Sequence, residues 1–157
     1  MSDIAIQTKT TIEQQLKKKI LILDGAMGTM LQQANLTAED FGGEEYEGCN
    51  EMLTLTRPDV IRNIHEIYLE AGADLIETNT FGGASIVLAE YDLQDRSREI
   101  NMVAAKLARE AADKWSTPEW PRFVAGSIGP TTKTLSVTGG VTFEADRYLL
   151  YTGARSH

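Results

Sequence analysis

The sequence contains a single cysteine, Cys49, among its 157 residues, and this scarcity limits the chemistry open to it. One cysteine cannot form a disulfide within the chain, and no Cys or His pair stands at the spacing that metal sites use. The two histidines, His65 and His157, are explained by surface or core packing. The residues themselves therefore predict no metal site, and Cys49 is expected to be a lone thiol that is buried or merely tolerated.

Basic residues are also in the minority, with 15 Lys and Arg against 23 Asp and Glu and a net charge of -8. No stretch gathers basic and aromatic residues as a nucleic-acid-binding surface does. No apolar run approaches the ~18 residues that span a bilayer, and residues 1–10 lack the apolar core of a signal peptide. We therefore predict a cytoplasmic protein whose partners include neither nucleic acid nor a membrane.

Short apolar runs are present instead, and each ends in a small polar loop that contains glycine. The runs are residues 20–23, 74–77 and 123–125, and the loops after them are residues 24–29, 78–83 and 126–131. Such runs suit strands buried on both faces, and helical patterns between them make the strands parallel. All these loops should emerge at one edge of one sheet, where α/β proteins bind ligands.

The segments between the runs predict helices. Apolar spacing favours helices over residues 58–71, 84–91 and 95–114, and a capping box at Thr11 predicts a short helix that ends at Lys19. The acidic, glycine-broken residues 41–48 are expected to be irregular and exposed. Residues 143–151 suit a helix capped by Thr142, and residues 148–151 alternatively suit a fourth strand.

The strands are few for a complete sheet, because a doubly wound fold has about five or more. The loops lie further apart than the ~30 residues of a minimal strand-helix unit. About three such enlarged units fit the first part of a (β/α)8 TIM barrel, which needs ~250 residues. We therefore expect an α/β chain in which residues 20–157 form an incomplete barrel domain and residues 1–19 an N-terminal helical extension.

The first loop places a carboxylate, Asp24, directly before Gly25 and Ala26. A carboxylate suits an ammonium group, and the closely approachable amides of Gly25 and Ala26 suit a carboxylate, so this loop can hold an amino acid by both ends. The alternative is a tight turn in which Asp24 only caps the following residues. Both interpretations stay open on the sequence alone.

Polar side chains also follow the second and third runs. Asn79 and Thr80 come after Glu77, and Ser127 stands in the third loop. These residues are expected either to line a ligand site or to tie neighbouring loops together. None is a recognisable nucleophile, because no histidine is placed to act as its base.

Taken together, residues 23–30, 71–82 and 125–131 resemble the homocysteine S-methyltransferase family. Residues 48–51, 57–61 and 132–136 are most similar to the amino-terminal, homocysteine-binding domain of its cobalamin-dependent members, which make methionine. The resemblance implies a (β/α)8 barrel that binds homocysteine and activates its thiol on zinc. It also implies methylcobalamin as the methyl donor and further folate- and cobalamin-binding domains as partners.

Carried over by position, the resemblance assigns Asp24, Gly25 and Ala26 to the amino-acid end of homocysteine. It assigns Asn79, Thr80 and Ser127 to the lining of the site. The zinc-binding cysteines of the family, and the acidic residue of its fourth strand, have no counterpart in this sequence. We therefore expect a homocysteine-binding portion of the enzyme that is inactive alone, with no catalytic residue of its own.

Two other hypotheses stay open. In the first, the chain is a non-catalytic binding or assembly fragment that pairs with a second chain completing the barrel. In the second, it is a small complete α/β enzyme whose only candidate carboxylates are Asp24 and Glu77.

Overall fold

The structure, a computed structural model, describes residues 12–131. The expected helix or strand over residues 142–151 lies outside them, as does Thr11 of the expected capping box. Residues 12–16 are helical, so the first helix ends before Lys19. The further elements are α2 (Met27–Gln33), α3 (Ala38–Phe41), η1 (Glu44–Tyr46), η2 (Asn50–Met52), α4 (Leu53–Thr56), α5 (Pro58–Glu70), β1 (Leu75–Glu77), α6 (Ser85–Leu88), η3 (Ala89–Tyr91), η4 (Gln94–Arg96), α7 (Ser97–Trp115) and β2 (Phe123–Ala125).

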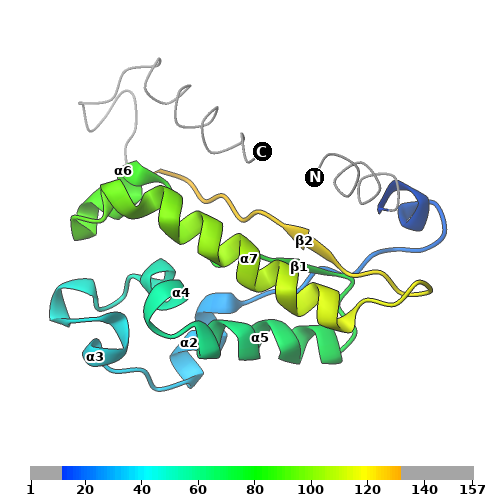
Figure 1. The fold of residues 1–157 in the computed structure, drawn as a ribbon, viewed down its shortest axis with the longest axis horizontal. Helices are drawn as coiled ribbons and strands as arrows, with labels where there is room; N and C mark the ends of the chain where they lie inside the picture. Colours follow the sequence, from blue (N-terminus) through cyan, green and yellow to red (C-terminus); the bar gives the residue numbers. More distant parts are fainter. Residues whose placement is uncertain (1–11, 132–157) are drawn as a thin grey trace, which may run out of the picture.

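The sheet of the described residues is parallel, as the sequence predicts. Strand β1 pairs with β2, with Ile76 opposite Val124. The first apolar run joins the other side of β1 by a single parallel bridge, between Leu23 and Leu75. The three runs therefore lie side by side in the order 20–23, β1, β2, and all run toward the same end of the molecule (Figure 1).

The first run is not the doubly buried strand that its composition predicts. Ile20 is 91% exposed, Ile22 60% and Leu23 46%. The run joins β1 by a single bridge at one side of the described sheet, where its apolar side chains are left exposed. The prediction was wrong for this segment, which forms an edge of the described sheet.

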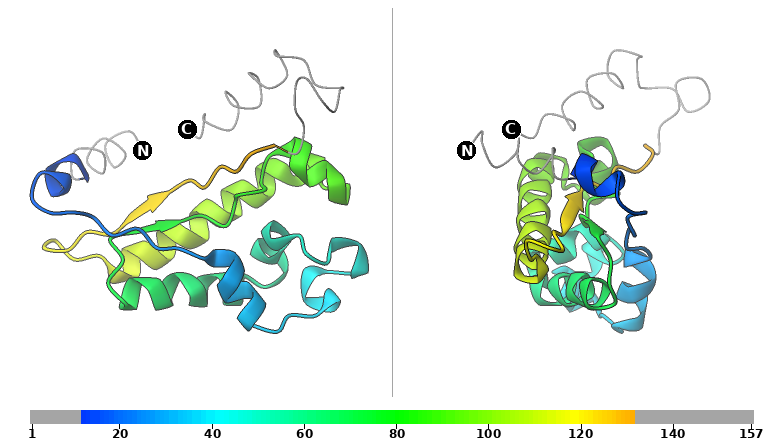
Figure 2. Two further views of the ribbon diagram at one scale, coloured as in Figure 1. Left: turned by 180° about the vertical axis from the view of Figure 1, so that it is seen from behind. Right: turned by 90° about the vertical axis from the view of Figure 1, so that its right-hand side faces the viewer.

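Helices α5 and α7 lie beside each other on one side of the sheet (Figure 1; Figure 2). Pro58 occupies the first turn of α5, where its missing N–H costs nothing, and Gly72 after the helix adopts φ 106°. The inner face of α7 is rich in alanine, which allows close packing. The predictions of these two helices are confirmed, and the short helix predicted over residues 84–91 is present as α6 followed by η3.

Ile76 of β1 is fully buried in a cluster with Leu69, Ala108 and Ala111 of the two helices. Because side chains alternate along a strand, Glu77 belongs to the opposite face of the sheet. The face that Glu77 occupies is the one that looks away from α5 and α7.

Residues 41–48 are more ordered than their composition predicts. They contain η1, and Phe41 is buried in a cluster with Leu31, Leu53 and Ile61. Phe41 anchors this segment against Leu53 and Ile61, and the chain turns at Gly42, which adopts φ 98°. The expectation of an irregular, exposed stretch was therefore wrong for its apolar members.

The end of the sheet where the strands begin is held by a buried carboxylate, Asp74. It accepts hydrogen bonds from Lys19 Nζ at 2.6 Å, Trp120 Nε1 at 2.6 Å and the Ile22 amide at 3.0 Å. The Arg122 guanidinium stacks on the Trp120 ring at 3.6 Å from its centroid. This Asp74 clamp fixes the chain just ahead of the first loop.

Candidate functional site

A cavity of about 260 Å³ opens where the parallel strands end. Its walls come from the loops after Leu23, β1 and β2, together with η2. All six predicted site residues line it, and the full lining is Asp24, Gly25, Ala26, Met27, Gly28, Asn50, Glu51, Glu77, Thr78, Asn79, Thr80, Phe81 and Ser127. The structure thus brings together residues that lie as much as a hundred positions apart in the sequence.

Asp24 is fixed by the neighbouring strand. Its two carboxylate oxygens accept the Glu77 amide at 3.0 and 3.1 Å, and the Asp24 amide donates to Leu75 O at 2.9 Å. Helix α2 follows with Ala26 as its N-cap and no side-chain cap, so Asp24 does not cap the turn. Of the two alternatives left open by the sequence, the capping one was wrong.

The environment of Asp24 also changes its acidity. Burial raises the pKa of Asp24 to about 6, the Glu77 amide opposes this shift, and the negative charge of the Glu77 side chain adds to it. A positively charged group bound next to Asp24 would therefore favour its ionised form.

The backbone of the first loop turns sharply at Ala26, which adopts φ 42° and ψ 43°. This left-handed conformation is uncommon for a residue with a side chain. A side chain placed at Gly25 or Gly28 would meet nothing within 4 Å, so both face open space. Helix α2 begins at Met27, within the segment 24–29 that the sequence predicts as a loop.

Thr78, Thr80 and Ser127 form a closed set of hydrogen bonds. Thr80 Oγ1 donates to Ser127 O at 2.8 Å, and the Ser127 amide donates to Thr78 Oγ1 at 3.1 Å. Because the Thr80 proton is committed to that carbonyl, Thr78 must be the donor in the 2.6 Å contact between the two hydroxyls. These threonines join the second loop to the third, as the loop-tying alternative predicts.

Asn79 connects the second loop to a segment that sequence reasoning missed. Its Nδ2 donates to Asn50 O at 2.8 Å and to Thr54 Oγ1 at 3.2 Å. In return, Glu51 Oε1 accepts the Gly82 amide at 2.7 Å. Asn50 and Glu51 enter the pocket through these contacts, and the only sequence signal for them was the family-like segment 48–51.

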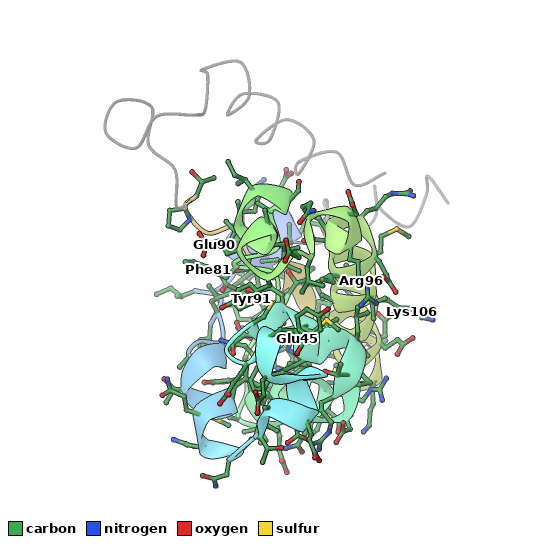
Figure 3. All side chains as sticks on the ribbon, turned by 90° about the vertical axis from the view of Figure 1, so that its left-hand side faces the viewer. Glu45, Phe81, Glu90, Tyr91, Arg96 and Lys106 are labelled. Carbon is green, nitrogen blue, oxygen red and sulfur yellow. The ribbon has the colours of Figure 1, made fainter. Side chains whose placement is uncertain are left out.

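Phe81 is the apolar side chain at the rim of the pocket, and it is 62% exposed. Figure 3 views the molecule from the end toward which the strands run and shows Phe81 at the surface. Its carbonyl accepts the Gly129 amide at 2.9 Å, which holds the second and third loops together at this rim.

The described residues do not fit a zinc site. No group of three or more His, Cys, Asp or Glu within residues 12–131 is arranged to hold a metal ion. Cys49 is buried among Met52, Leu88 and Ile100, outside the pocket lining, and burial raises the pKa of its thiol. A raised pKa disfavours the thiolate that binds metal.

A parallel α/β unit with an acidic pocket at its strand ends belongs to the class of α/β proteins that bind ligands at that edge. A family model for homocysteine S-methyltransferases matches residues 21–152. The chain belongs to the homocysteine S-methyltransferase family, as its motifs predicted.

Two similar proteins are methionine synthases. The one from Mycobacterium leprae is 49% identical over 127 residues, which is 81% of this chain, and the one from Mycobacterium tuberculosis is 50% identical over 118 residues, or 75%. The match covers 10% of each relative, so this chain spans about a tenth of their length.

Solved structures of the homocysteine methyltransferase MmuM from Escherichia coli share the fold. The oxidized form gives a TM-score of 0.61 at 28% identity, covering 73% of this chain and 39% of that chain. The metallated form gives 0.66 at 24% identity, covering 85% and 48%, and at that identity shows the fold alone. The described residues are thus an α/β unit similar to part of a homocysteine methyltransferase. No helix among them is long and apolar enough to cross a membrane.

Proposed function

We propose that this chain is the homocysteine-binding portion of a methionine synthase, an enzyme that transfers a methyl group to the homocysteine thiol. Its described residues would then be the first strand-helix units of a (β/α)8 barrel. Family membership, and the half-identity with two methionine synthases, support this proposal. The remaining strands and the folate- and cobalamin-binding domains are its proposed partners.

The observation that carries the proposal is the chemistry of the pocket wall. Asp24 supplies a carboxylate, and the open backbone at Gly25 and Ala26 lies directly beside it. Homocysteine at neutral pH carries an ammonium and a carboxylate on the same carbon, so it can use both features at once. Asn79, Thr80 and Ser127 line the cavity that its side chain would enter.

The proposed role of the described residues is confined to holding the amino acid. Zinc and cobalamin are implied by the family, but no set of described side chains fits the metal. We therefore assign no step of methyl transfer to residues 12–131.

The test is the binding of L-homocysteine to the purified chain by isothermal titration calorimetry. Asp24→Asn should weaken binding by about tenfold or more, because a charge-assisted hydrogen bond becomes a neutral one. An Asn oxygen can still accept the Glu77 amide, so the tie to β1 survives. Asp113→Asn, on the outer face of α7, is the matched control and should bind as the unaltered chain does.

The pH dependence of binding provides a second readout. Only the ionised Asp24 attracts an ammonium, so affinity should rise as the pH increases through the Asp24 pKa of about 6. Equal affinity of Asp24→Asn and the unaltered chain, at every pH, would contradict the proposed role of Asp24.

A further inference from the structure

The side chains that line the pocket offer hydrogen-bond acceptors that lack positively charged partners among the described residues. Three carboxylates line it, those of Asp24, Glu51 and Glu77, and its lining contains no Lys, Arg or His. None of the three forms an ion pair with another described residue. A ligand in this cavity therefore meets side-chain acceptors without a compensating positive charge.

Asn79 points to the same conclusion independently. Its side chain is only 5% exposed, and both Nδ2 protons are committed, to Asn50 O and Thr54 Oγ1. Because a carbonyl can only accept, the Asn50 contact fixes which end of the amide is nitrogen. Asn79 Oδ1 is therefore left as an acceptor with no partner among the described residues, in the wall of the cavity.

Glu77 is the carboxylate with the least internal use. It lies on the sheet face opposite the helices, and its one side-chain hydrogen bond among the described residues is a long one, from Ser127 Oγ at 3.4 Å. Glu51, by comparison, accepts the Gly82 amide at 2.7 Å, and Asp24 accepts the Glu77 amide. Because Glu77 has only this weak donor, a ligand that brings hydrogen-bond donors would stabilise it more than the other two carboxylates.

We propose that Asp24, Glu77 and Asn79 Oδ1 form one acceptor-only wall that selects ligands bearing a primary ammonium group, and that Glu77 sets this selectivity. An ammonium supplies three N–H donors and a positive charge, which matches three acceptors of which two are charged. The inference rests on the proposed function, because it concerns the same pocket. It goes further by giving Glu77 a role in specificity that the assignment of Asp24 does not require.

The test compares pairs of ligands that differ in the ammonium group alone. L-homocysteine is paired with 4-sulfanylbutanoate, which lacks the amino group, and n-butylammonium is paired with butan-1-ol. Binding of each to the full chain is followed by ¹H–¹⁵N NMR, which also reports whether each variant is folded. The unaltered chain should prefer the ammonium member of each pair by about tenfold or more.

Glu77→Gln keeps the shape of the side chain and its backbone amide but removes the charge. It should reduce the preference for the ammonium member by about tenfold, whereas Glu77→Asp, which keeps the charge, should retain a preference. Glu110→Gln on α7 removes one carboxylate far from the pocket and controls for net charge; it should leave the preference unchanged.

The outcomes separate the two proposals. If the chain binds n-butylammonium through Glu77 but does not bind homocysteine, the acceptor wall stands and the proposed function fails. If homocysteine and 4-sulfanylbutanoate bind equally, or if Glu77→Gln keeps the full preference, the acceptor wall is overturned while homocysteine binding stands. Binding of neither amine overturns both.

Discussion

His65 is a fully buried side chain of α5, and neither of its ring nitrogens has a hydrogen-bond partner among the described residues. Burial lowers the pKa of His65 to about 4, from an ordinary value near 6.5. The imidazole is therefore neutral in the folded chain at physiological pH. The sequence allowed surface or core packing for this histidine, and the structure shows the core.

This histidine makes stability depend on pH. The His65 imidazole takes up a proton near pH 6.5 in the unfolded chain but only near pH 4 in the folded chain. The contribution of neutral His65 to the stability of the fold is therefore complete above pH 6.5 and is lost as the pH falls toward 4. Asp24 acts in the opposite sense, because its folded pKa is raised and its contribution is lost as the pH rises toward 6.

We expect His65→Leu to remove the histidine component. The difference in unfolding free energy between the variant and the unaltered chain should grow in favour of the variant between pH 6.5 and 4, by about 3 kcal/mol at most. Urea unfolding at several pH values measures it. A difference that does not change with pH would contradict a neutral, buried His65.

At this scale the sequence identified the carboxylate of the first loop but not its partner. Asp24 was expected to meet a ligand or cap its own turn, and within the described residues it accepts the Glu77 amide of the next strand. That bond depends on the registration of two segments more than fifty residues apart, which periodicity does not specify.

Among the elements, the first run and β1 are joined by one bridge and by backbone hydrogen bonds of Ile22, and the Asp74 carboxylate adds bonds from the Ile22 amide and Lys19 Nζ. Burial disfavours the ionised Asp74, but its donors Lys19, Ile22 and Trp120 outweigh burial and hold the pKa of Asp74 below its ordinary value. The carboxylate of Asp74 is therefore ionised, and these three donors stabilise its negative charge.

Asp74→Asn should loosen the first run without unfolding the helices. The amide replaces a charged acceptor of three donors by a neutral one, and we expect hydrogen exchange at the Ile22 and Asp24 amides to accelerate by about tenfold. Exchange within α5 and α7 should be unchanged. Equal acceleration in those helices would indicate global destabilisation, and no acceleration would show that the clamp does not hold this run.

The elements were predictable where one physical signal dominated. Pro58, the apolar spacing of α5 and the alanine-rich face of α7 all predicted helices that the structure contains. Within residues 41–48 the glutamates are exposed as predicted, and the prediction failed at Phe41, whose burial in the core the surrounding glycines and acids do not reveal. The first run was mispredicted because its composition does not show that it lies at an edge of the described sheet, where its apolar side chains stay exposed.

For the molecule as a whole, exposed apolar side chains gather on the first run, at an edge of the described sheet. Unpaired edges of this kind favour strand addition by another chain. Such an edge is compatible with the hypothesis that the chain pairs with a partner that completes the barrel.

We expect the isolated chain to self-associate as its concentration rises, and Ile22→Lys to suppress this. The lysine places a charge on the edge, while the Ile22 backbone contacts to Asp74 are kept. Sedimentation velocity over a range of concentrations measures both. A chain that stays monomeric throughout, or an Ile22→Lys variant that associates as strongly, would count against the edge as the cause.

Ala26 has a consequence for how this sequence can vary. Its left-handed backbone, at φ 42°, is imposed by the passage from the Asp24 loop into α2, and it is open to few side chains. Glycine fits there with less strain, asparagine is tolerated, and branched residues such as valine are excluded by the backbone. Backbone geometry thus limits position 26 before any ligand is considered, and in a saturation library scored for folding this position should favour glycine and asparagine over branched residues.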